Sequence, residues 1–101
     1  MSGQKIYQRK EYSIYKAGYG YIVHNTNKEF KDGHTHCKNF YKAKRLIDLA
    51  IKKEIPKKVN RWEIQSLIRI TNNNVYRNKL LMIIDKLDNE VVMHGESKKS
   101  E

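Results

Sequence analysis

YSIYKAGYGYIVHN, residues 12–25, is the stretch that decides the fold. Aromatic and apolar side chains alternate with other side chains along it, which is the spacing of a β-strand that buries one face. Gly18 and Gly20 stand at its centre, where a tight turn uses backbone angles that are open mainly to glycine. The pattern predicts strands at residues 11–16 and 19–25, paired as an antiparallel hairpin.

The segments on either side of the hairpin set the extent of the sheet. A second turn is expected over residues 25–33, which are rich in Asn and close with an Asp-Gly pair, followed by a third strand over residues 34–38. Residues 1–10 are polar and are expected to form a flexible N-terminus. The alternative that Ile6 and Tyr7 add an edge strand stays open.

The first helix is predicted over residues 40–53. At 100° per residue its apolar side chains fall on one arc, and most of its basic side chains lie outside that arc. Asn39 precedes the helix as an N-cap, and Pro56 ends it, because the residue before a proline avoids helical angles.

Two more helices are predicted after this one. Asn60 and Glu63 have the spacing of a capping box, in which each side chain accepts the backbone N–H of the other residue, so a helix is expected over residues 61–70. A run of asparagines interrupts it, because Asn side chains compete for backbone hydrogen bonds. A last helix is expected over residues 74–87.

The order of these elements, strands first and helices after them, predicts an α+β domain. A small N-terminal antiparallel sheet, of two or three strands, would be packed by about three helices. A chain of 101 residues has the size of one domain, which we place at residues 11–87. Residues 88–101 are expected to form an acidic, disordered tail.

The distribution of charge is the strongest indication of function. Lys and Arg total 21 against 11 Asp and Glu, a formal net charge of +10. Residues 1–87 hold 19 of the bases and 7 of the acids, so the excess lies outside the predicted acidic tail. Such a field attracts polyanions and speeds their capture, whatever the fold.

Several classes of protein are excluded by what the sequence lacks. A single cysteine allows no intrachain disulfide, and we find neither a secretion signal nor an apolar run long enough for a bilayer, so we expect a cytoplasmic protein that is not bound to membranes. We find no paired acids for acid–base catalysis, no glycine-rich phosphate loop and no Ser-His-Asp set. We therefore expect no enzyme activity, no cofactor and no small-molecule substrate.

Nine bases, against only Asp48 and Glu54, lie between residues 38 and 61. One helix face provides cations at the spacing that phosphates require, although a solvated helix face in a basic protein remains the alternative. The candidates for phosphate contacts are Lys42, Arg45, Lys52, Lys53, Lys57, Lys58 and Arg61.

Exposed aromatic side chains are a second candidate feature. Tyr12, Tyr19 and Tyr21 lie in the predicted hairpin, where tyrosines stack on bases or form cross-strand pairs that stabilise the sheet. Trp62 shares a helix face with Arg69, away from the apolar side chains, which is typical of a binding anchor; the alternative is that it closes the core.

EIQSLIRITNNNVYRNKL, residues 63–80, resembles a helix-turn-helix DNA-binding element. The resemblance implies that the asparagine run, Tyr76 and Arg77 begin a recognition helix that reads base edges. The alternative is a pair of packed core helices, which would bury Tyr76 and expose Val75. The candidates for finer contacts are Arg69, Asn73, Asn74 and Arg77.

Residues 12–55 are similar to the small amino-terminal arm-binding domain of some tyrosine recombinases. That domain has a three-stranded sheet followed by one helix whose start often has the pattern F-x-x-A, matched here by Phe40 and Ala43. The resemblance implies that the sheet lies in the major groove of DNA.

Four possible zinc ligands lie in the predicted sheet: His24, His34, His36 and Cys37. His36 and Cys37 are adjacent, and adjacent residues of a strand point to opposite faces, so the four cannot close one tetrahedral site. We therefore predict no metal site, with Cys37 buried as a small apolar side chain.

Together these features predict a small, basic, non-enzymatic protein that binds nucleic acid as an accessory or regulatory factor. DNA is the nucleic acid that we expect. The alternative is an interaction factor of a phage or mobile element that binds an acidic protein surface and uses its charge for electrostatic steering.

Overall fold

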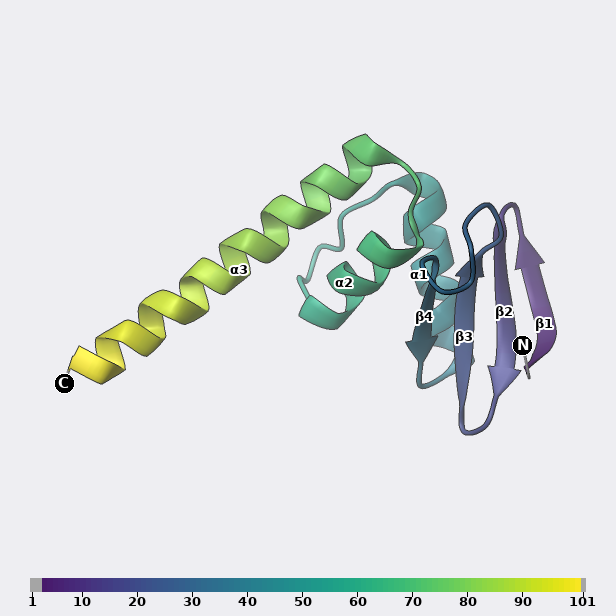
Figure 1. The fold of residues 1–101 in the computed structure, drawn as a ribbon, viewed down its shortest axis with the longest axis horizontal. Coiled ribbons are helices and arrows are strands. Elements are labelled where there is room, and N and C mark those ends of the chain that lie inside the picture. The colour runs from purple at the N-terminus through teal and green to yellow at the C-terminus, as the bar shows by residue number, and fades with distance from the viewer. Residues whose placement is uncertain (1–2, 101) are drawn as a thin grey trace.

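A computed structural model describes the backbone of residues 3–100 and the side chains of residues 3–89. The predicted α+β class is confirmed: an N-terminal antiparallel sheet is followed by three helices that pack against it (Figure 1). The strands are β1 (Gln4–Arg9), β2 (Tyr12–Ala17), β3 (Gly20–Asn25) and β4 (His34–Cys37). The helices are α1 (Phe40–Lys52), α2 (Arg61–Ile70) and α3 (Asn74–Ser100).

The sheet has four strands in the order β1-β2-β3-β4, all antiparallel. Gly18 takes a φ of 58° in the β2–β3 turn, an angle that L-residues with a side chain rarely adopt. Gly20 is needed for a different reason, because a Cβ there would lie 2.8 Å from the carbonyl oxygen of Cys37 on β4. Both glycines predicted to shape the hairpin therefore have a structural role.

Residues 4–9, for which the sequence predicts flexibility, form the edge strand β1 instead. Tyr7 anchors the strand, because its ring meets that of Phe40 at the start of α1 edge-on, with 5.8 Å between the centroids. The pairing with β2 is irregular between Lys5 and Tyr7, where the register shifts. The alternative of an edge strand is the one that the structure has.

One face of the sheet and the inner sides of the helices form the core. The predicted apolar arc of α1 is buried at its centre, with Ala43, Leu46 and Ile47 fully covered. In Figure 1, α1 lies behind the sheet, whereas the β3–β4 loop lies in front of the sheet. The core comprises Tyr12, Ile14, Val23, Cys37, Ala43, Leu46, Ile47, Leu49, Ala50, Ile64, Leu67, Ile70, Tyr76 and Leu80.

The helix starts are where the sequence predicts them. The Asn39 side chain accepts the N–H of Lys42, and the Asn60 side chain accepts the N–H of Glu63. Only half of the predicted capping box forms, however, because the Glu63 carboxylate binds Arg45 rather than the backbone of Asn60. α1 ends with Lys53 in the left-handed region, ahead of Pro56.

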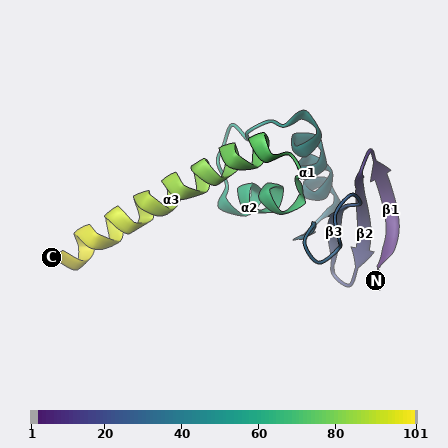
Figure 2. The same cartoon turned by 45° about the horizontal axis from the view of Figure 1, so that its top comes forward.

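The last helix is longer than predicted. The sequence predicts an end at residue 87 and a disordered tail over residues 88–101, but the backbone stays helical to Ser100, and Glu101 lies outside the described residues. In both Figure 1 and Figure 2, α3 projects well beyond the rest of the domain. Within the described part of the chain, no helix combines the length and the apolar character that crossing a membrane requires.

Candidate nucleic-acid interface

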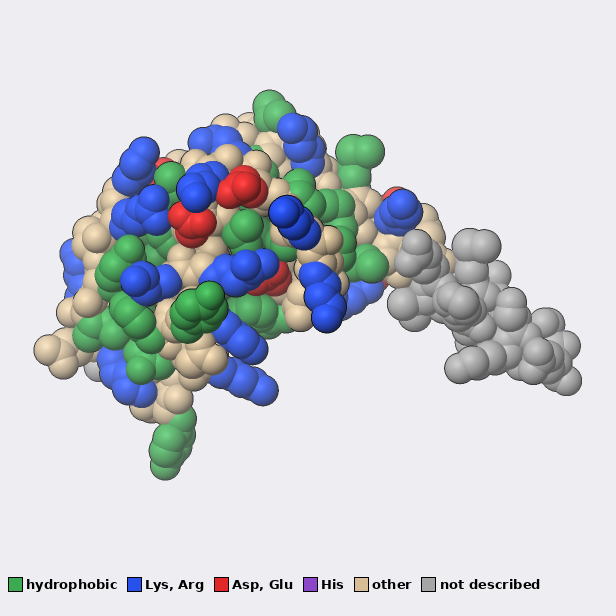
Figure 3. All heavy atoms as spheres, turned by 180° about the vertical axis from the view of Figure 1, so that it is seen from behind, with side chains coloured by type: hydrophobic (Ala, Val, Ile, Leu, Met, Phe, Trp, Pro, Cys, Tyr) green, Lys and Arg blue, Asp and Glu red, His purple; other side chains and the backbone are tan. Residues whose placement is uncertain are grey.

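The side of the domain that carries α1 is rich in Lys and Arg. Figure 3 shows this side, on which basic side chains outnumber acidic ones. Of the nine bases between residues 38 and 61, three form ion pairs: Arg45 with Glu63, Lys52 with Asp48, and Arg61 with Asp88. The other six are exposed, and no acid among the described side chains lies within 4.0 Å of them: Lys38, Lys42, Lys44, Lys53, Lys57 and Lys58.

The paired cations are held in fixed positions by their partners. The Nε of Arg45 donates to the buried Glu63 carboxylate at 2.7 Å, and this hydrogen bond raises the pKa of Arg45. Asp48 lies between Arg9, at 3.2 Å, and Lys52, at 3.4 Å, and its hydrogen bond from Arg9 is the main reason that its pKa is lowered. Arg45, Lys52 and Arg61 therefore offer phosphates less charge than the sequence alone indicates.

An open hollow of about 840 Å³ lies where the β2–β3 turn, the end of β4 and the amino ends of α1 and α2 meet. Six of its lining side chains carry rings, charges or an amide: Tyr19, His36, Lys38, Lys42, Asn60 and Trp62. None of the acids among residues 3–89 lines it. We call it the aromatic hollow.

The side chains of the aromatic hollow differ in how firmly they are held. Tyr19, at the tip of the hairpin, is fully exposed. Trp62, in the first turn of α2, is 37% exposed, and the Nζ of Lys42 lies 5.9 Å from the centroid of its ring, within the range of a cation–π contact. The Asn60 oxygen is engaged as the α2 cap. Burial raises the pKa of the Cys37 thiol to about 12, so this residue contributes no thiolate.

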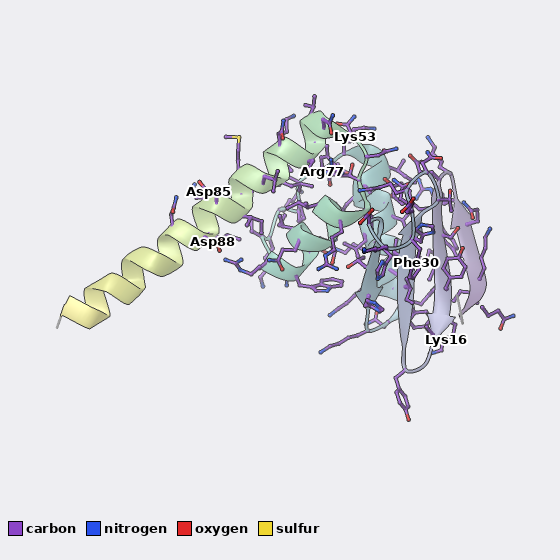
Figure 4. All side chains as sticks on the ribbon, viewed as in Figure 1. Lys16, Phe30, Lys53, Arg77, Asp85 and Asp88 are labelled. Carbon is purple, nitrogen blue, oxygen red and sulfur yellow. The ribbon has the colours of Figure 1, made fainter. Side chains whose placement is uncertain are left out.

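The α2–α3 turn uses most of its predicted contact residues for its own structure. Asn73 caps α3, with its side-chain oxygen accepting the N–H of Tyr76 at 2.8 Å. Arg77, which Figure 4 shows near the start of α3, donates to the carbonyls of Ile68 and Thr71. It also donates to the side chain of the exposed Asn74, at 3.3 Å.

Two more side chains complete the cap on the carboxyl end of α2. The buried Asn25 donates to the carbonyl of Ile70 at 2.8 Å. Lys28 donates to that of Arg69 at 3.1 Å, and burial, reinforced by the charge of Arg77, lowers the pKa of Lys28. The charges of Lys28 and Arg77 stabilise the negative end of the helix, and Asn25 donates, like both of them, to a carbonyl that a helix leaves unpaired. Arg69 itself stays exposed, without an acid partner among the described side chains.

The stretch that resembles a helix-turn-helix forms α2, a short turn and the start of α3, and the resemblance implies that Tyr76 belongs to the recognition helix. Tyr76 is only 2% exposed, and its hydroxyl donates to the carbonyl of Glu54 at 2.7 Å, whereas Val75 is 67% exposed. This is the arrangement that two packed core helices predict. Tyr76 cannot reach a base from this position.

His24, His34 and His36 lie with Phe30 on the face of the sheet opposite α1. Phe30, labelled in Figure 4, stacks on His34, with 4.2 Å between the ring centroids. His24 approaches Phe30 edge-on, with 5.3 Å between the centroids. Cys37 is buried on the other face. Across the described residues, no group of three or more His, Cys, Asp or Glu side chains is placed to hold a metal ion.

Comparison with known proteins adds no constraint: no family model, no curated protein and no solved structure matches this chain.

The structure thus divides the predicted contact residues into three groups. The first group has no acid partner among the described side chains and comprises Lys53, Lys57, Lys58, Arg69 and Lys42, of which Lys42 also lines the aromatic hollow. The second group is ion-paired and comprises Arg45, Lys52 and Arg61. The third group shapes the α2–α3 turn and comprises Asn73, Asn74 and Arg77. The sequence indicated Tyr19 and Trp62 separately but not that they border one hollow. The two helix caps, Asn39 and Asn60, were the available signal, because they mark the helix ends that meet there.

Proposed function

We propose that this protein is a small, non-enzymatic nucleic-acid-binding factor, acting on DNA in an accessory or regulatory role. The observation that carries the proposal is the set of six exposed cations between residues 38 and 58 that have no acid partner among the described side chains. Cations that are not already neutralised displace the counterions of a phosphate backbone, which is the main source of sequence-independent affinity.

The proposal assigns phosphate contacts to two groups of side chains. Lys38, Lys42 and Lys44 lie at the amino end of α1, and Lys53, Lys57 and Lys58 follow its carboxyl end. The protein would act in the cytoplasm, where its one buried cysteine stays reduced.

The salt dependence of binding to duplex DNA tests the proposal. If all six cations contact phosphates, the slope of log K against log salt is about −5. The triple variant Lys53→Gln, Lys57→Gln and Lys58→Gln should reduce it to about −3, because each lost contact removes roughly 0.9. The matched control, Lys79→Gln with Lys86→Gln, removes exposed cations of α3 and should leave the slope near that of the original protein.

Two results would contradict the proposal. Absence of binding to duplex and single-stranded DNA and RNA at low salt would favour an acidic protein partner instead. The triple variant loses three charges and its control loses two, so the same change in slope per lost charge in both would show that net charge, rather than the α1 side of the domain, determines binding.

A further inference from the structure

The aromatic hollow contains two rings whose exposure the fold does not explain. Tyr19 is fully exposed, so its side chain contributes nothing to the packing of the hairpin. Trp62 presents more than a third of its surface, although a tryptophan gains more than most residues from burial. Neither ring pairs with another aromatic ring among the described residues.

The polar groups of the hollow include cations and hydrogen-bond donors that suit an anionic ligand. Lys38 and Lys42 supply positive charge, and no described acid lines the hollow to oppose it. Asn60 is exposed, and because its oxygen accepts the N–H of Glu63, its amide group remains as a donor. Lys42 approaches the Trp62 ring, so charge and ring face are presented together.

Cations beside exposed rings match a nucleic-acid strand better than they match phosphate alone. Phosphate contacts need only charge, which the rest of the α1 side already supplies. Every base, by contrast, has a π-face that stacks on an aromatic side chain whatever the sequence. In a duplex both faces of each base are covered by neighbouring pairs, so only an unpaired base can use such rings.

We propose that the aromatic hollow binds unpaired bases of a single nucleic-acid strand, with Tyr19 and Trp62 stacking on the bases and Lys38 and Lys42 contacting the adjacent phosphates. Its volume of about 840 Å³ lies within the range of sites that enclose a small organic group. This inference rests on the proposed function and specifies it: the protein would favour unpaired over duplex nucleic acid.

Trp62 is the only tryptophan, so the fluorescence of the protein reports on the hollow directly. The probe is a single strand of about 12 nucleotides, the length scale of single-strand sites, in deoxy and ribo forms. The matched control is a strand of the same length with abasic positions, which keeps the phosphates and lacks the bases. Quenching by strands that carry bases, and none by the abasic strand, is the expected result; the more effective of the two forms identifies the preferred sugar.

Variants locate the effect. Tyr19→Ala should lower single-strand affinity about tenfold and leave duplex affinity unchanged, and it removes no packing contact. Trp62→Ala should do the same, and Trp62→Phe should restore part of the affinity. The control is Tyr41→Ala, which removes a tyrosine of α1 that is 78% exposed but lies outside the hollow, and it should change neither affinity.

The outcomes separate this inference from the proposed function. Equal quenching by the abasic strand, or equal losses for single strand and duplex in the Tyr19 and Trp62 variants, would overturn the stacking role and leave phosphate binding in place. Tighter binding of polyglutamate than of either strand would assign the hollow to an acidic protein. Absence of binding to any nucleic acid would refute both proposals.

Discussion

Replacing Asn25 with alanine should destabilise the protein by about 2–3 kcal/mol, because this buried side chain connects the sheet to α2. Its amide donates to the carbonyl of Ile70 at 2.8 Å, and its oxygen accepts the N–H of Asn27 at 2.9 Å. Ile70 is buried, so its carbonyl would lose its partner with little access to water, which costs about 1–3 kcal/mol. Asn27 is exposed and its N–H can be rehydrated, so the second bond adds less, and the void left by the shorter side chain adds the remainder.

Urea unfolding followed by far-UV circular dichroism measures this change. With a slope of about 1.5 kcal/mol per molar urea, the midpoint should fall by about 1.3–2 M. The matched control is Thr26→Ala, which removes an exposed hydrogen bond from the hydroxyl to the carbonyl of Glu11, and its cost should stay within about 0.5 kcal/mol. If Asn25→Ala costs no more than Thr26→Ala, the connection between β3 and α2 does not stabilise the fold as argued.

Three further predictions follow from other parts of the fold. Burial raises the pKa of Tyr12 from 10.0 and that of Cys37 from 9.0, in each case to about 12. Because the folded pKa exceeds the unfolded one, the stability contributed by each neutral group is fully present below its unfolded pKa and is lost as the pH rises toward 12. Circular dichroism should therefore show alkaline unfolding, and Tyr12→Phe should shift its midpoint upward; no shift would contradict the role of burial. Gly18→Ala should lower stability by about 1 kcal/mol through its positive φ, and Gly20→Ala by more because its Cβ would meet a β4 carbonyl, so equal losses in thermal unfolding would refute the distinction. Arg77→Gln should cost about 1–2 kcal/mol of stability and leave the salt slope of DNA binding unchanged, since its guanidinium caps α2; a shallower slope would instead place it on the DNA.

Local signals were enough to predict most of the secondary structure. Strands β2, β3 and β4 follow from alternation and turn residues, and the starts of α1 and α2 follow from Asn39 and Asn60. β1 was predicted to be flexible because the contacts that anchor it to α1, between Tyr7 and Phe40 and between Arg9 and Asp48, join residues far apart in the sequence. The sequence showed a polar segment and could not show those contacts.

The candidate site was less predictable, because it depends on how elements pack. The sequence contains the charge of Arg45, but only the packing of α1 against α2 brings Glu63 next to it. In the same way, the sequence shows that Lys28 and Arg77 are cations, but it does not show that both donate to carbonyls at the carboxyl end of α2. The aromatic hollow arises where three separate segments meet, so no pattern within one segment could define it.

The position of β1 has a consequence for self-association. A strand at the edge of a sheet exposes unpaired N–H and C=O groups, onto which another chain can add. β1 carries the exposed Lys5 and a shift in register, while its Arg9 is ion-paired with Asp48, so two copies that approach edge to edge bring the charge of Lys5 onto an irregular backbone. If the proposed function holds, a bound polyanion neutralises that charge, and copies crowded along one strand are the setting in which two such edges can pair.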